Sequence, residues 1–193
     1  LFEKTDGASV SNLTIEGTTL TQNTQKGALS NDIRHSVVTD IRVKDLAINN
    51  DTNQTGGLAG TIADSEIRRI SVENISIRSN NTMGGIAGQF DGKIMEDCVV
   101  SGSIEGTSVH PMGVRAGGIT GWQGGGTIRR VVTKVNITAP APVGNGGIIG
   151  GPQSGSAAVE SAVSLSTGAN ANRISGWDVL GMSSSAYELE TSD

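Results

Sequence analysis

A five-residue phrase rich in glycine recurs along the 193-residue chain and constrains its fold more than any other feature. Successive copies begin 26 to 33 residues apart, and two weaker copies begin at Gly27 and Asn172. A fixed period of this length is typical of proteins that stack one structural unit on the next. The four clear copies read GGLAG at 56–60, GGIAG at 84–88, GGITG at 117–121 and GGIIG at 146–150.

Each unit also carries apolar residues that alternate with polar ones. The pattern Ile67-x-x-Ile70-x-Val72-x-x-Ile75-x-Ile77 occurs 29 residues earlier, from Val38 to Ile48. Period-two alternation of mostly β-branched residues predicts strands with one buried face. The two-residue breaks predict corners, and the glycine phrase supplies a further buried position. This position holds Leu29, Leu58, Ile86, Ile119, Ile148 and Ile174.

These patterns predict an all-β fold, a right-handed parallel β-helix of about six to seven rungs, where a rung is one turn of the coil. Residues 1–193 form one domain, with clear repeats over 27–176 and an edge strand, cap or linker over 177–193. A leucine-rich repeat is the alternative, but Gly and Ser stand where its helix formers would be. Glycines such as Gly85 and Gly118 are expected at corners, with positive φ or close backbone approach.

The period also predicts which side chains stack on one another. Thirteen residues after each unit's first glycine, charges alternate in sign, and charges of opposite sign on adjacent parallel strands favour this register. The predicted charge ladder is Asp40, Arg69, Asp97 and Arg130, continued by Glu160 or its neighbour. The predicted buried column beside it is Ile41, Ile70, Cys98 and Val131.

Composition excludes several classes of function. The formal charge of −5 comes from 19 acidic and 14 basic residues that are dispersed along the chain, so we expect no nucleic-acid partner. No apolar run approaches the roughly 18 residues of a membrane span, so we expect no membrane insertion. The single cysteine, Cys98, is expected to be a buried apolar residue. The chain starts at Leu1 without a signal segment, which suggests a piece of a larger protein.

No catalytic motif is present in the sequence. The two histidines, His35 and His110, lie in different units, and zinc-helix, nucleophile-elbow and phosphate-loop patterns are missing. Asp40, Asp45, Asp97 and Arg69 could form the cluster of a β-helical polysaccharide enzyme, but the charge ladder explains most of them more simply. We therefore expect a non-catalytic domain with no cofactor or metal.

Two features suggest a binding surface. The third full unit is longer than the others near residues 106–113, and His110 and Met112 lie in this insertion. Loops on a regular scaffold often carry binding residues, although a neutral insertion is the alternative. Trp122 and Trp177 each follow a glycine phrase, where they could anchor a partner, stack on a sugar ring or cover a corner.

The phrase G-G-[LI]-x-G, together with Asp97-Cys98-Val99-Val100-Ser101-Gly102-Ser103-Ile104, resembles the GLUG repeat of bacterial surface proteins. It is most similar to the repeat region of IgA1-protease-type zinc metalloproteases of streptococci and related Gram-positive bacteria, over about residues 27–176. The resemblance implies a secreted, cell-surface module that is not catalytic. It also implies that zinc lies in a catalytic domain elsewhere in the same polypeptide.

Two hypotheses follow. In the first, the chain is a spacer or docking surface of such a protease, with a host glycoprotein such as immunoglobulin A as partner. In the second, it is a surface adhesin domain that binds host protein or glycan through Trp122, Trp177 or the His110 insertion. An H-E-x-x-H motif downstream favours the protease, whereas further repeats without that motif favour the adhesin.

Overall fold

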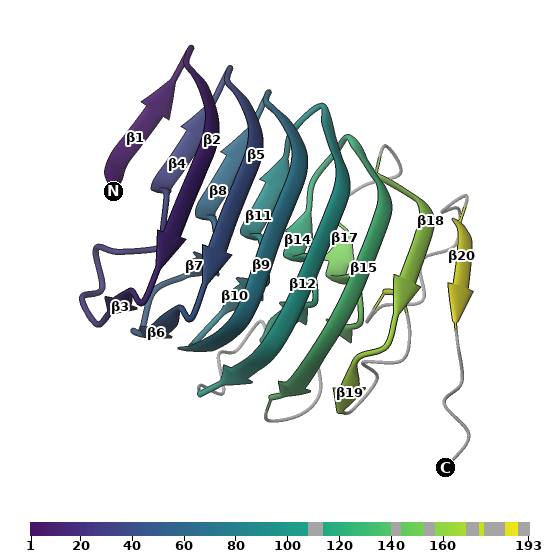
Figure 1. Cartoon of the computed structure of the whole chain (residues 1–193). Coiled ribbons are helices and arrows are strands. Elements are labelled where there is room, and N and C mark those ends of the chain that lie inside the picture. The colour runs from purple at the N-terminus through teal and green to yellow at the C-terminus, as the bar shows by residue number, and fades with distance from the viewer. Residues whose placement is uncertain (108–113, 140–143, 153–156, 169–173, 176–183, 189–193) are drawn as a thin grey trace.

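The chain winds into a right-handed β-helix (Figure 1). The computed structural model describes residues 1–107, 114–139, 144–152, 157–168, 174–175 and 184–188. Every regular element among these residues is a strand, and the paired strands run parallel. The predicted fold class is confirmed, with about five rungs. This number is slightly lower than predicted, in part because the weak copy at Gly27 adds no strand to the smallest sheet.

Three parallel sheets form the walls of the coil. The long sheet contains β2 (Ser9–Glu16), β5 (Val37–Lys44), β9 (Glu66–Ser79), β12 (Ile94–Gly106), β15 (Thr127–Thr138), β18 (Ala158–Ser164) and β20 (Ser184–Glu188), with the short strands β3 (Thr19–Leu20), β6 (Ala47–Asn49) and β19 (Thr167–Gly168). The six-stranded sheet contains β1 (Phe2–Asp6), β4 (Ser30–Arg34), β8 (Ala59–Ala63), β11 (Ala87–Asp91), β14 (Thr120–Gln123) and β17 (Ile149–Pro152). The four-stranded sheet contains β7 (Gln54–Gly56), β10 (Thr82–Gly84), β13 (Arg115–Gly117) and β16 (Asn145–Gly146).

The core consists of aliphatic columns that run along the coil axis. The predicted column is confirmed, because Ile41 pairs with Ile70, Cys98 pairs with Val131, and all four are buried. The column from the glycine phrase is also buried, except that Ile174 is only partly covered. Burial raises the pKa of the Cys98 thiol to about 12.

Two details of the predicted corners are corrected by the structure. The breaks in the apolar pattern are single-residue kinks within one strand, such as Arg69 and Asn74 of β9, whose φ angles are 53° and 52°. Gly85 and Gly118 do not have positive φ. They are required because the next rung passes too close for a side chain. A Cβ on Gly85 would lie 2.2 Å from the carbonyl oxygen of Gly118.

The charge ladder exists, but it is divided into pairs. Arg69 binds Asp40 through two hydrogen bonds of 2.7 and 2.8 Å, and Arg130 binds Asp97 through two of 2.6 and 2.9 Å. The Asp40 carboxylate fills the planar fork of the Arg69 guanidinium, so Arg69 does not bridge both acids. All four residues have positive φ. In the last unit this position is held by Ser161, the neighbour of Glu160.

A second charged cluster lies beside this ladder and was not predicted. Glu96 is 3% exposed and pairs in register with Arg68 on one side and Arg129 on the other. Its Oε1 contacts Arg68, and its Oε2 accepts hydrogen bonds of 2.8 Å from Arg129 and 2.6 Å from Arg130. One buried carboxylate therefore joins three rungs.

These pairs predict that acid destabilises the domain. Hydrogen bonds from Arg69 and Arg130 lower the pKa of Asp40 and Asp97, and hydrogen bonds from Lys4 and His35 lower that of Asp6 to about 2. A carboxyl with a lowered folded pKa stabilises the fold above its unfolded pKa, about 3.9 for Asp, and this contribution is lost as pH falls through the folded value. We expect the melting temperature to fall between pH 4 and pH 2.

Circular dichroism melts at pH 5, 4, 3 and 2 would measure this loss. The double variant Asp40→Asn, Arg69→Gln lacks one pair and should show a shallower dependence on pH. Equal melting temperatures of the wild-type protein at pH 5 and pH 2 would contradict a role for the ion pairs.

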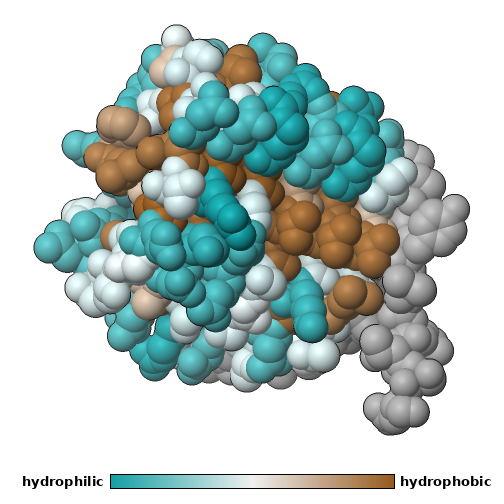
Figure 2. Space-filling view, viewed as in Figure 1, coloured by the Kyte–Doolittle hydropathy of each residue, from teal (hydrophilic) through white to brown (hydrophobic). Residues whose placement is uncertain are grey.

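The outer face of the long sheet carries an apolar stripe. Val99 pairs in register with Val132, and Val132 pairs with Val163. Val99 and Val132 are exposed, and Figure 2 shows brown surface over this part of β12, β15 and β18. Brown surface also lies at the N-terminal end of the stack, where Leu1 and Phe2 are exposed, and much of the remaining surface in this view is polar.

Candidate functional site

Two outward-facing columns meet where the four-stranded sheet turns into the six-stranded sheet. The first column contains Gln54, Thr82 and Arg115, which pair in register across β7, β10 and β13. The second contains Gln89 and Trp122, which pair across β11 and β14. Both columns arise from the repeat, because equivalent positions of successive rungs stack about 4.8 Å apart.

A hollow of about 320 Å³ lies between these columns. It is called the Trp122 hollow here. Amide, hydroxyl, aromatic and guanidinium groups line it, which is an unusual combination for a chain whose aromatic residues make up only 3% of the sequence. The lining residues are Asn53, Gln54, Asn81, Thr82, Gln89, Arg115 and Trp122.

Trp122 is half-buried and packs against Arg115 of the same rung. The guanidinium carbon lies 3.9 Å from the centre of the indole ring, which is a cation–π contact. Arg115 itself is 7% exposed. Burial lowers the pKa of its guanidinium, but an arginine remains charged in a folded protein. The contact fixes the plane of the indole ring at one end of the hollow.

A chain of hydrogen bonds orients the amides at the other end. Gln54 Nε2 donates to Gln89 Oε1 at 2.8 Å, and Gln89 Nε2 donates to Asp91 Oδ2 at 2.5 Å. The Asp91 carboxylate can only accept hydrogen bonds, so it determines the orientation of the Gln89 amide and, through it, that of the Gln54 amide. Thr82 Oγ1 donates to the carbonyl of Asn53. These polar groups are thus held in place before any ligand binds.

Asn81 contributes a buried acceptor to the lining of the hollow. Its Oδ1 is buried, and among the described residues no donor lies within hydrogen-bond distance of it. A buried acceptor without a partner destabilises a protein by about 1–3 kcal/mol, so such groups are rare and often have a functional explanation.

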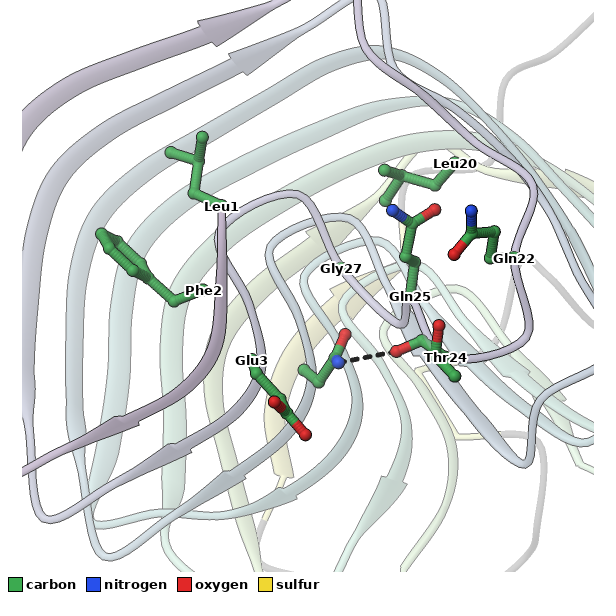
Figure 3. Close-up of a pocket in the computed structure, with 9 residues that line it drawn as sticks. Leu1, Phe2, Glu3, Leu20, Gln22, Thr24, Gln25 and Gly27 are labelled. Carbon is green, nitrogen blue, oxygen red and sulfur yellow. Dashed lines mark hydrogen bonds between the residues drawn. The ribbon is translucent and has the colours of Figure 1, made fainter.

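A second hollow, of about 450 Å³, lies at the N-terminal end of the stack. Figure 3 shows Leu1 and Phe2 on one side of it and Leu20, Gln22 and Gln25 on the other. Within it, Asn31 Nδ2 donates to the carbonyl of Thr24 at 2.6 Å. This hollow lies beside the first rung, and its lining includes one aromatic side chain, Phe2, and one charged side chain, Glu3.

Of the four predicted partner-binding residues, the structure describes Trp122 alone. His110, Met112 and Trp177 lie outside the described residues. Sequence reasoning missed Gln54, Asn81, Gln89 and Arg115. A signal for two of them was present, because Gln54 and Arg115 stand two residues before successive glycine phrases, as Thr82 does between them.

The ionisable residues considered for catalysis have other partners. Asp40 and Asp97 pair with arginines, and Asp45 accepts a 2.6 Å hydrogen bond from Asn74. Within the described residues, no group of three or more His, Cys, Asp and Glu side chains is arranged to hold a metal ion. The same residues contain no helix long and apolar enough to span a bilayer.

Comparisons were made with protein-family models, curated proteins and solved structures. None of the three gave a match to this chain.

Proposed function

We propose that this chain is a non-catalytic β-helical module that acts as a spacer and as a protein-docking surface in a larger cell-surface protein. On the resemblance of its repeats, the parent is a zinc metalloprotease of the IgA1-protease type. Its zinc and catalytic domain lie elsewhere in the same polypeptide. The docked partner is a host glycoprotein such as immunoglobulin A, and the module works outside the cell.

The observation that carries this proposal is that acidic side chains form ion pairs with arginines of neighbouring rungs. Asp40, Glu96 and Asp97 each bind arginine from a neighbouring rung, so these carboxylates hold the coil together. General acid–base catalysis needs a group that titrates near the working pH. The pKa values of Asp40 and Asp97 are instead lowered by their arginine partners, and burial holds that of Cys98 near 12.

The Trp122 hollow is equally compatible with the second candidate, a surface adhesin domain. Its preset amides and fixed indole suit ligand recognition whether or not a protease domain follows. The complete polypeptide distinguishes the two parents, because only the protease requires an H-E-x-x-H motif in another domain.

Two measurements on the purified chain test the proposed function. We expect no hydrolysis of peptide or glycoside substrates, with or without added zinc. We also expect saturable binding of immunoglobulin A to the immobilised chain, with an unglycosylated protein such as ubiquitin as negative control. Hydrolysis that a single substitution in this chain abolishes would refute the non-catalytic assignment. Absence of binding at tens of micromolar immunoglobulin A would refute the docking role for this partner.

A further inference from the structure

We propose that the Trp122 hollow is a subsite for an uncharged pyranose ring of a glycan. This inference rests on the proposed docking function and names the chemical class of the ligand. The aromatic, neutral polar and charged groups that line the hollow each match this class of ligand.

The aromatic group supplies a flat surface. Trp122 is half-buried and lines the hollow, and Arg115 at 3.9 Å holds the indole in one orientation. A pyranose ring presents C–H groups on its faces, and these pack well on the electron-rich face of an indole. Because the ring is already fixed, binding costs little additional side-chain entropy.

The neutral groups supply hydrogen bonds. Five of the seven lining residues carry an amide or hydroxyl, and the amides of Gln54 and Gln89 are oriented in advance through Asp91. Sugar hydroxyls both donate and accept, which matches side-chain amides. Asn81 Oδ1 requires a donor, and rotation of this amide toward the hollow would let a hydroxyl provide one.

Charge argues against other ligands. Arg115 is the single ionised residue among the seven that line the hollow, and it is 7% exposed. A site for phosphate, nucleic acid or an acidic sugar would present several accessible cations. A peptide anchor would need a deeper apolar pocket than one half-buried indole provides. An uncharged sugar fits the groups present.

An array of immobilised oligosaccharides tests the proposal. It carries neutral glycans that end in galactose, mannose or N-acetylglucosamine, and sialylated counterparts. We expect binding to one or more neutral glycans that changes little between 50 mM and 500 mM NaCl. Tryptophan fluorescence of the Trp177→Phe protein, in which Trp122 is the remaining indole, should shift when that glycan is added in solution.

Three substitutions separate binding from folding. Trp122→Ala should weaken binding about tenfold, the loss expected for one aromatic stacking contact. Asn81→Leu should weaken binding about fivefold while leaving the melting temperature unchanged or higher, because it removes an acceptor that has no partner in the free protein. Val132→Ala, on the outer face of the long sheet, should bind as the wild type does.

Several results would overturn the proposal. The first is a wild-type protein that binds no glycan on the array. The second is glycan binding whose affinity is the same in Trp122→Ala as in the wild type. The third is binding to sialylated glycans alone that disappears at high salt. Binding of immunoglobulin A from which the glycans have been removed distinguishes the glycan subsite from the docking function. Equal binding before and after glycan removal would leave the docking function standing and would reject the glycan subsite.

Discussion

Gly118→Ala is expected to destabilise the protein by about 3 kcal/mol or more, although it adds a single methyl group. The new Cβ would lie 2.1 Å from the carbonyl oxygen of Gly147 and 2.8 Å from a methyl group of Thr133. The Gly147 carbonyl belongs to the backbone of the next rung, so it cannot move without disturbing the stack. Urea unfolding followed by circular dichroism would measure the loss.

Gly7→Asn is the matched control. Gly7 has a φ of 62°, and a Cβ added there would have no atom within 4 Å. Asparagine tolerates this backbone conformation, so the stability should change by less than about 1 kcal/mol. If Gly118→Ala were as mild as the control, close approach of the rungs could not be the reason for glycine in the phrase.

Glu96→Gln is expected to cost about 2 kcal/mol, the second largest of the predicted effects. The neutral amide leaves three guanidinium groups close together around a position that is 3% exposed. The arginine side chains are 31% to 47% exposed, so water reduces the cost below that of a fully buried ion pair. The free energy of unfolding in urea is again the measurement.

Glu105→Gln makes the same chemical change on the same strand at an exposed position. Glu105 Oε1 lies 3.5 Å from Arg78 Nε, and both side chains are more than half exposed. We expect a change of no more than about 0.5 kcal/mol. Equal losses for the two variants would show that the Glu96 cluster adds nothing beyond a surface ion pair.

The repeat made the register predictable. Ile41, Ile70, Cys98 and Val131 could be placed in one column because a shared period fixes which residues of successive rungs meet. The conformation of Gly118 was not predictable in the same way. Glycine is required both where φ is positive and where backbones approach closely, and the sequence does not distinguish these two causes.

The site was predictable only in part, because its geometry depends on a corner between two sheets. Trp122 was chosen for its residue type, whereas Arg115 acquires its role from the 3.9 Å contact across that corner. The Glu96 cluster was missed although Arg68, Glu96, Arg129 and Glu160 alternate in sign at equivalent positions. Such alternation indicates a register but does not show that the carboxylate is buried.

The direction of the hydrogen bonds has a mechanical consequence. In a parallel β-helix the bonds between strands point along the coil axis, and β1 and β20 lie at opposite ends of the stack (Figure 1). Tension applied to the two ends of the chain therefore acts on the hydrogen bonds of one boundary between rungs at a time. It does not shear all the strands of a sheet at once. Because each rung contacts only its neighbours, the coil would lengthen in steps of about one repeat, at a nearly constant force.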